Sequence, residues 1–126
     1  MRKEGTTKPR TTRKAQRNSP LHIRRKFLSA PLSPSLKTQH GAKTMTIIED
    51  DTVQIIKGDR KMTEGKVLRV DTQEGKLFIE GVSRTRLDGT TVQIPIRSAN
   101  VMITKLDLKD DWRKKILERK GFKKEE

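Results

Sequence analysis

The side chains with the clearest chemical capacity in this sequence are cationic, and they concentrate at one end of the chain. Residues 1–45 hold 12 Lys and Arg against the single acid Glu4, whereas residues 46–106 hold 10 against 9 acids. Lysine and arginine bind phosphate groups, and a basic arm beside a near-neutral body is suited to follow a nucleic-acid backbone. The net charge of +14 and the pI near 10.5 therefore indicate a polyanionic partner.

The same basicity allows two less specific interpretations. A tail that is merely disordered would show the same composition, although disorder in the free protein is compatible with folding on nucleic acid. Packing of duplex DNA is also open, because positive charge alone does not distinguish DNA from RNA. The charge pattern thus predicts a nucleic-acid partner without fixing its kind.

The two histidines, His22 and His40, lie 18 positions apart without acidic neighbours. This arrangement lacks the clustered ligands of a metal site, so we expect no metal and no cofactor. His22 stands among Arg24, Arg25 and Lys26, and contact with a phosphate or a base is its expected role.

Four aspartates are the remaining candidates for catalysis. They are Asp50, Asp51, Asp59 and Asp88; the first two precede an expected strand and Asp88 belongs to an Asp-Gly turn dipeptide, both ordinary structural uses. No nucleophile–base pair, phosphate-cradling loop or metal-ligand spacing accompanies them. The chain also has no cysteine, which excludes thiol nucleophiles, thiolate zinc sites and disulfides. We therefore expect neither an enzyme nor a small-molecule substrate.

The composition limits how much of the chain can fold alone. Its 126 residues suit one domain, but only 30% are apolar and 37% are charged, too few apolar side chains to bury the whole chain. No apolar run exceeds three residues, which excludes a membrane span and a secretory signal. We expect a soluble, cytoplasmic protein.

The middle of the chain has the pattern of a small barrel. Val92, Ile94 and Ile96 alternate with polar residues, and turn signals occur at residues 73–75 and 88–89. Pro95 lacks an amide hydrogen and predicts an edge strand or an outward-facing amide. Five short strands without crossover helices favour an open barrel, either SH3-like or OB-like. The predicted strands are 52–57, 66–71, 76–81, 91–97 and 100–104.

Aromatic content indicates how such a barrel would bind RNA. Phe78 is the only ring in the barrel, whereas surfaces that grip single strands stack bases on several rings. Contacts with phosphate and sugar on a folded RNA are therefore the better expectation.

Short helices are expected on both sides of the barrel. In the tail, Pro20 and Pro34 suit first helical positions, and the helices that they begin are too short to be stable without a surface to pack on. A C-terminal helix is predicted over residues 109–120, with acids in its first turn and bases in its last. Trp112 and Ile116 share a stripe, so we expect Trp112 to dock this helix on the barrel or on a neighbour; a ring that contacts a base is the alternative.

Residues 53–67 carry the most specific motif, because they look like a KOW motif. Gly58 and Gly65 bound a loop between two strands, and Arg60 and Lys61 stand at its tip. KOW modules also occur in transcription elongation factors, so a regulatory transcription module is an alternative function.

Several further segments resemble one family in order and spacing. They include Phe78–Val82, Leu87–Thr90, Ile94–Ile96 and Ser98–Leu106, with Ser19–Lys26 and Leu28–Ser33 upstream. Together they are similar to the large-subunit ribosomal protein twenty-four family in its archaeal and eukaryotic form, over roughly residues 13–108.

The resemblance implies a structural ribosomal protein with an SH3-like KOW barrel and a basic N-terminal extension. Such proteins bind the first domain of the large-subunit rRNA early in assembly, beside the mouth of the exit tunnel and among neighbouring large-subunit ribosomal proteins. Carried over by position, the implied RNA contacts are Gly58, Arg60, Lys61, Arg84, Arg86 and Arg97 in the barrel, and Arg10, Arg13, Lys14, Arg17, His22, Arg24, Arg25 and Lys26 in the extension.

Two positions depart from the family pattern. Met62 stands where a glycine is usual and would be strained by about 1 kcal/mol if that position needs a positive φ. Arg60 stands where an aromatic residue is common, which favours phosphate contact over stacking. We expect three parts: the basic RNA-binding extension (1–45), the barrel (46–106), and the C-terminal helix with its charged tail (107–126).

Overall fold

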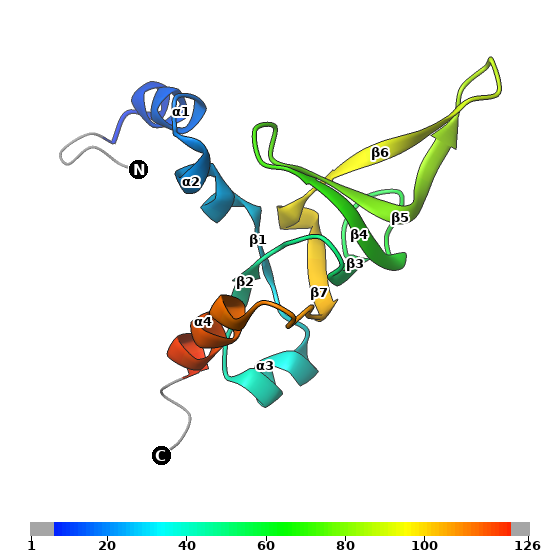
Figure 1. Ribbon diagram of the computed structural model, residues 1–126. Coiled ribbons are helices and arrows are strands. Elements are labelled where there is room, and N and C mark those ends of the chain that lie inside the picture. Colours follow the sequence, from blue (N-terminus) through cyan, green and yellow to red (C-terminus); the bar gives the residue numbers. More distant parts are fainter. Residues whose placement is uncertain (1–6, 122–126) are drawn as a thin grey trace.

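The structure, a computed structural model, describes residues 7–121 and has a five-stranded antiparallel sheet at its centre (Figure 1). The strand order is β6–β5–β4–β3–β7, and each strand overlaps one expected from the sequence. The fold is therefore the mostly β, SH3-like type, which is one of the two types that the pattern left open and the one that the family resemblance implies. The strands are β3 (Thr52–Ile55), β4 (Glu64–Asp71), β5 (Lys76–Thr85), β6 (Thr91–Arg97) and β7 (Val101–Lys105).

The inner face of this sheet follows from the alternation of residues along each strand. Val53 and Ile55 in β3 are fully buried, as are Leu77 and Ile79 in β5, while the residues between them point outward. Pro95 lies in β6, an edge strand, as its missing amide hydrogen predicts. The apolar residues at alternate positions thus supply one wall of the core.

The N-terminal segment contains more regular structure than expected. The helices expected after Ser19 and Ser33 are present, and the Ser33 hydroxyl caps the second by accepting from the Leu36 amide at 3.4 Å. A helix before residue 18 and a two-stranded sheet were not predicted. The elements are α1 (Pro9–Arg17), α2 (Leu21–Arg24), the 3-10 turn η1 (Arg25–Leu28), β1 (Ser29–Pro31), α3 (Pro34–His40) and β2 (Thr44–Thr46).

The second half of this segment belongs to the core. Leu32 forms a bridge with Ile103 of β7, and the Ser33 amide donates to the Ile103 carbonyl at 2.9 Å. Burial of its apolar side chains supplies the surface on which the short tail helices fold. Its buried core residues are Leu28, Ala30, Leu32, Ala42 and Met45.

The C-terminal helix α4 (Asp111–Gly121) is present as predicted, but Trp112 does not dock it on the barrel. The Trp112 side chain is 69% exposed, whereas Arg113 and Leu117 are buried. Residues 113 and 117 are one turn apart and share the face turned to the body, while Trp112 lies about 100° away from Arg113 around the helix. A partly buried Ile116 flanks that face.

A buried ion pair anchors α4. Both Arg113 Nη atoms contact the Asp51 carboxylate at 2.6 Å, and the two side chains are 4% and 0% exposed. Arg113 also donates to the carbonyls of Asp107 and Thr46, and Asp51 accepts from the amides of Ile48 and Asp107. The structural role expected for Asp51 is thus present, but the sequence did not indicate that Arg113 is its partner. Among the helices of residues 7–121, none is long and apolar enough to cross a membrane.

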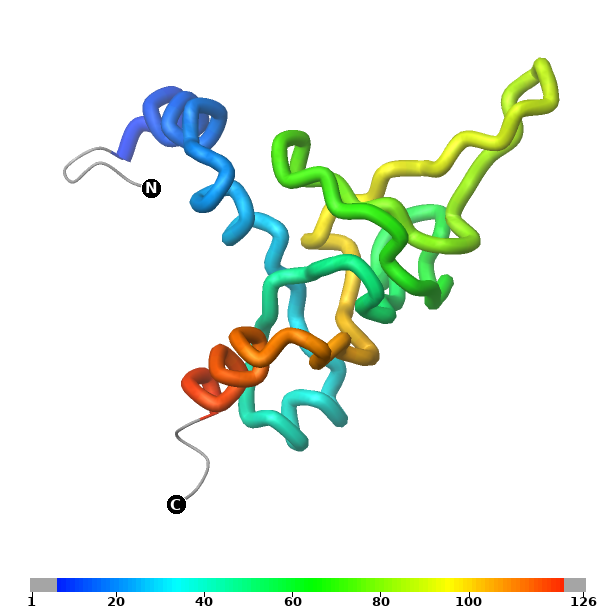
Figure 2. Tube along the Cα trace, viewed as in Figure 1, coloured from blue at the N-terminus to red at the C-terminus, as the bar shows by residue number. Residues whose placement is uncertain are grey.

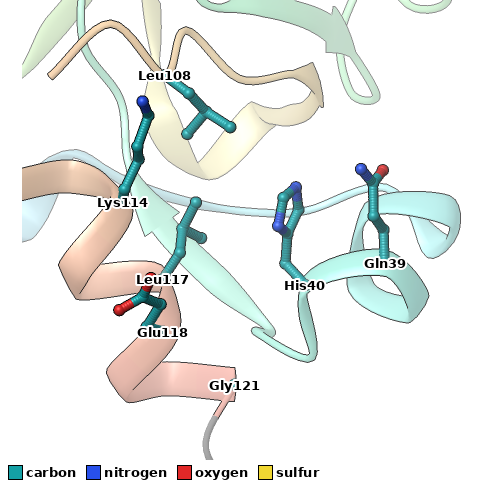
Figure 3. Close-up of a pocket in the computed structure, with 7 residues that line it drawn as sticks. All are labelled: Gln39, His40, Leu108, Lys114, Leu117, Glu118 and Gly121. Carbon is teal, nitrogen blue, oxygen red and sulfur yellow. The ribbon is translucent and has the colours of Figure 1, made fainter. Parts of the chain in front are cut away.

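The inward face of α4 meets α3 beside an open hollow of about 580 Å³. Figure 3 shows His40 and Gln39 of α3 opposite Leu117 and Glu118 of α4. This contact holds the last helix next to the segment that precedes β2. Trp112 does not line this hollow.

Candidate nucleic-acid interface

Helix α1 presents four of the predicted contacts on one face. Arg10, Arg13, Lys14 and Arg17 follow a spacing of three and four residues and line a common hollow of about 450 Å³. All four side chains are exposed, and none forms an ion pair within residues 7–121. Like charges at this spacing repel each other, and α1 buries no residue. Bound anions would remove that repulsion.

Arg24 holds the basic helices against the sheet. Its guanidinium donates to the carbonyls of Ser19 at 2.9 Å, Gln73 at 2.7 Å and Arg17. Gln73 lies in the turn between β4 and β5, so one half-buried side chain joins the end of α1 to the barrel. These bonds give Arg24 a positioning role.

The other predicted contacts of this segment point to solvent. His22, Arg25 and Lys26 are exposed around α2 and η1. The backbone beneath them is fixed to the barrel, because Ser98 Oγ donates to the Phe27 carbonyl at 3.0 Å. His22, Arg25 and Lys26 therefore project into solvent from a backbone segment that is attached to the barrel.

The KOW loop between β3 and β4 depends on two residues with positive φ. Gly58 has φ 99° and Met62 has φ 72°, so the family's glycine position does require the left-handed region that Met62 occupies here. The Met62 amide donates to the Ile55 carbonyl at 2.8 Å, which closes the loop. Gly65 has a different role, since a Cβ there would lie 2.5 Å from the Glu80 carbonyl oxygen. It lets β4 pass close to β5.

The two cations at the tip of this loop differ in their surroundings. Arg60 is half-buried, and its Nη2 donates to the Ser83 carbonyl in β5 at 3.1 Å. Lys61 is exposed and has no ion pair within the described part of the chain. Arg60 therefore fixes the loop against the β5–β6 hairpin, while Lys61 is available to a partner.

The β5–β6 hairpin projects from the body of the molecule (Figures 1 and 2). Its pairing shifts register between Phe78 and Ser83, and the strand beyond that point carries the exposed Arg84. Arg86 is exposed at the start of the tip, where its amide donates to the Thr90 carbonyl at 2.8 Å. The predicted contacts on this hairpin thus extend well away from those of α1.

The tip itself is ordered by Asp88. One Asp88 carboxylate oxygen accepts from the Thr90 hydroxyl at 2.7 Å and from the Thr90 amide at 3.0 Å. These hydrogen bonds hold the pKa of Asp88 below its ordinary value. Leu87 beside it is fully exposed.

The outer face of the sheet adds cations that were not predicted. Arg69 lies over the Phe78 ring, with Cζ 4.2 Å from the ring centroid, and Lys76 pairs across the strands with the predicted contact Arg97. Leu77 faces the core and pairs with Val70 and Ile96, which therefore lie on the same face. Arg69, Lys76 and Arg97 are the next residues along these strands, so they lie on the opposite, outer face. Strand alternation alone could have identified Arg69 and Lys76. Because Phe78 is half-buried and a guanidinium lies over its ring, the single ring of the barrel is not a free stacking surface.

The fourteen predicted contacts therefore occupy several separate surfaces. Twelve are exposed, and only Arg24 and Arg60 are half-buried in backbone hydrogen bonds. The four α1 cations come together, whereas the α1 helix and the hairpin tip lie apart in Figure 2. An extended partner that reaches both surfaces fits this distribution better than a compact ligand.

Comparison with known proteins identifies the family. The model of the family that comprises the eukaryotic ribosomal proteins L26 and their archaeal L24-type counterparts matches residues 6–120. The chain belongs to this ribosomal protein family. The match extends beyond the span of roughly 13–108 recognised from the sequence and includes all fourteen predicted contacts. Family membership makes the chain a structural protein and not an enzyme.

Curated relatives agree with this family over most of their length. The large ribosomal subunit protein uL24 of Methanosarcina barkeri is 50% identical over 105 residues, covering 83% of this chain and 90% of that protein. The protein of the same name from Korarchaeum cryptofilum is 45% identical over 94% of this chain and 91% of its own. That of Methanothrix thermoacetophila is 47% identical over 88% of this chain and 96% of its own.

Proposed function

We propose that this protein is a structural component of the large ribosomal subunit and binds large-subunit rRNA through phosphate contacts. The observation that carries the proposal is the row of four exposed cations on α1, which has no carboxylate partner within residues 7–121. Burying that row against phosphates would remove the repulsion among its charges. The exposed cations of the hairpin and the KOW loop would hold further backbone segments.

The finer assignment rests on the family. In this assignment the protein binds the first domain of the rRNA and acts early in subunit assembly. It lies by the exit tunnel among neighbouring ribosomal proteins, in cytoplasmic ribosomes. The relatives that carry the name of a large-subunit protein support this assignment. The separation of the cationic surfaces is consistent with a partner as extended as rRNA.

Salt dependence of binding tests the phosphate contacts. If eight of the tail cations each neutralise one phosphate, the affinity for a first-domain rRNA fragment falls with a log–log salt slope of about −6 to −7. Replacing the four α1 cations by glutamine should reduce the magnitude of that slope by about 3. A matched control replaces four exposed lysines elsewhere, Lys66, Lys105, Lys109 and Lys114, and should change the slope less. A slope near zero for the unaltered chain would contradict the proposal.

Partner identity needs two further measurements. At fixed salt, structured rRNA fragments should compete better than duplex DNA of the same length, because the contacts are distributed to fit a folded RNA. In a sucrose gradient, the full chain should sediment with the large subunit. Recovery only as free protein at the top of the gradient would count against a ribosomal role.

A further inference from the structure

Within residues 7–121, the side chain of Trp112 takes no part in docking α4 on the body. It is the only tryptophan of the chain and is 69% exposed on α4, whose attachment to the body uses Arg113 and Leu117 instead. Tryptophan presents a large apolar surface together with one polar N–H, and for this reason it is enriched at interaction surfaces. The exposed ring of Trp112 is thus available to a partner.

Two hollows flank Trp112 along α4. One, of about 490 Å³, is lined by Trp112, Lys115, Glu118 and Arg119. The other, of about 290 Å³, includes Trp112, Ile116, Lys120 and Arg25 of the tail. Residues 115 and 118 lie on one side of residue 112 around a helix, and residues 116 and 120 on the other. The ring therefore stands between two recesses.

The charge around the ring favours an anionic partner. Apart from the internally paired Arg113, the charged side chains that line the hollows are four cations and two acids, Asp110 and Glu118. The Lys115 ammonium lies over one face of the Trp112 ring, 4.6 Å from its centroid, and the exposed ring keeps its opposite face for a partner. The cores of protein–protein interfaces are depleted in lysine, and two lysines, Lys115 and Lys120, line these hollows, so this surrounding fits a nucleic acid better than a protein.

We propose that Trp112 is a stacking platform for an unpaired base of the same RNA, with Arg25, Lys115 and Arg119 beside the adjacent phosphates. The inference rests on the proposed function, because it adds a contact to RNA that the tail binds. Arg25 makes the two surfaces continuous, since it lines the Trp112 hollow and belongs to the basic segment. Stacking on an aromatic ring is compatible with any base, so affinity and not sequence preference should depend on Trp112.

The intrinsic fluorescence of Trp112 tests this contact directly in the full chain. Titration with large-subunit rRNA should quench the emission as binding saturates. Trp112→Leu should weaken binding on the order of 5- to 150-fold without changing the salt slope, whereas Trp112→Phe, which keeps a ring, should retain most of the affinity. Because Trp112 is exposed, both variants should keep the thermal midpoint of the unaltered protein. The matched control is Leu68→Ala, an exposed apolar residue on β4, which should bind RNA normally.

The outcomes separate this inference from the proposed function. If the unaltered chain binds rRNA with a steep salt slope but its emission is unchanged and Trp112→Leu binds equally well, only the stacking proposal fails. An emission change that occurs solely in the assembled subunit would assign the ring to a neighbouring protein and overturn the proposal. Absence of any salt-dependent binding by the unaltered chain would refute both.

Discussion

Arginine has two distinct uses in this protein, and burial separates them. Arg113, Arg24 and Arg60 bind carboxylate or backbone oxygens of the chain itself. The arginines of α1 and of the β5–β6 hairpin are exposed and have no ion pair within residues 7–121. The planar fork of donors suits both uses, because it can satisfy several oxygens at fixed angles. A substitution should therefore affect stability in the first group and RNA affinity in the second.

Loss of the Asp51 carboxylate should be severely destabilising. Asp51→Ala leaves the Arg113 guanidinium buried without its counter-charge, and removing one partner of such a pair costs about 3–5 kcal/mol. Urea unfolding measures the change. Asp50→Asn is the matched control, because Asp50 is half exposed, its contact with Lys66 is 3.8 Å long, and asparagine tolerates the left-handed backbone of this position, so its cost should be about 0–1 kcal/mol. Equal effects of the two substitutions would show that the Asp51 pair does not anchor α4.

The hairpin tip should lose order in acid. Hydrogen bonds from Thr90 lower the pKa of Asp88 in the folded protein, so the carboxylate's contribution is complete above its unfolded pKa of about 3.9. That contribution is lost as the pH falls through the lower folded value. An NMR titration of the Thr90 amide follows the transition. Thr90→Val removes the hydroxyl donor and should move the pKa of Asp88 upward; an unchanged midpoint would contradict this account.

At the scale of elements, the KOW loop combines a family motif with a departure from it. Gly58 and Met62 both adopt the left-handed conformation, but only glycine does so without a steric penalty. Arg60 then ties the loop to β5 through Ser83. The loop is thus held from its own ends and from the neighbouring hairpin, which explains how it tolerates a strained methionine.

Restoring the glycine should relieve that strain. Met62→Gly removes a left-handed conformation that costs about 1–2 kcal/mol, and the greater freedom of glycine in the unfolded chain offsets about 0.4–1 kcal/mol of the gain. The net expectation is a rise in unfolding free energy of roughly 0.8 kcal/mol, measured by urea unfolding. Gly58→Ala is the opposite control and should destabilise, because its φ of 99° is unfavourable for any side chain. A destabilised Met62→Gly would indicate that the Met62 side chain contributes packing.

The elements that the sequence failed to predict share a physical reason. Helix α1 has no side-chain cap and no buried residue, so neither a capping signal nor an apolar stripe marks it. Strands β1 and β2 have three residues each, which is too short for an alternation of apolar and polar residues to be recognised. Periodicity located the five barrel strands because each has a buried face. Docking of Trp112 on the barrel was wrongly predicted because its spacing to Ile116 also fits a core stripe. The contact that anchors the helix instead joins Asp51 and Arg113, which are 62 positions apart in the sequence.

The proposed RNA contacts were predicted from the sequence in a different way. Charge concentration indicated the basic tail, and the family resemblance supplied individual positions. Neither could show that Arg24 and Arg60 are engaged with backbone carbonyls, because their partners Gln73 and Ser83 are 49 and 23 positions away. Contacts at such separations depend on the folded topology. Sequence thus predicts which residues carry charge, and packing decides which of them face a partner.

At the scale of the whole molecule, the basic segment has two halves with different dependence on a partner. The described residues up to about 20 contribute no core side chain, whereas residues 28–45 contribute five. Burial of an apolar side chain is worth roughly 1.5–3 kcal/mol, and a small domain is stable by only about 5–15 kcal/mol in total. The second half is therefore required for folding, and the first half is free to serve binding.

Two truncations should separate these roles. Deletion of residues 1–20 should leave a cooperative unfolding transition but weaken rRNA binding and flatten its salt slope, since the α1 cations are lost. Deletion of residues 1–45 should abolish cooperative unfolding, because the sheet loses Leu28, Leu32 and Met45 from its core. Circular dichroism during thermal unfolding, with binding measured in parallel, distinguishes the two. If residues 46–126 fold cooperatively alone, the barrel is an independent domain and the packing of the tail on it is dispensable.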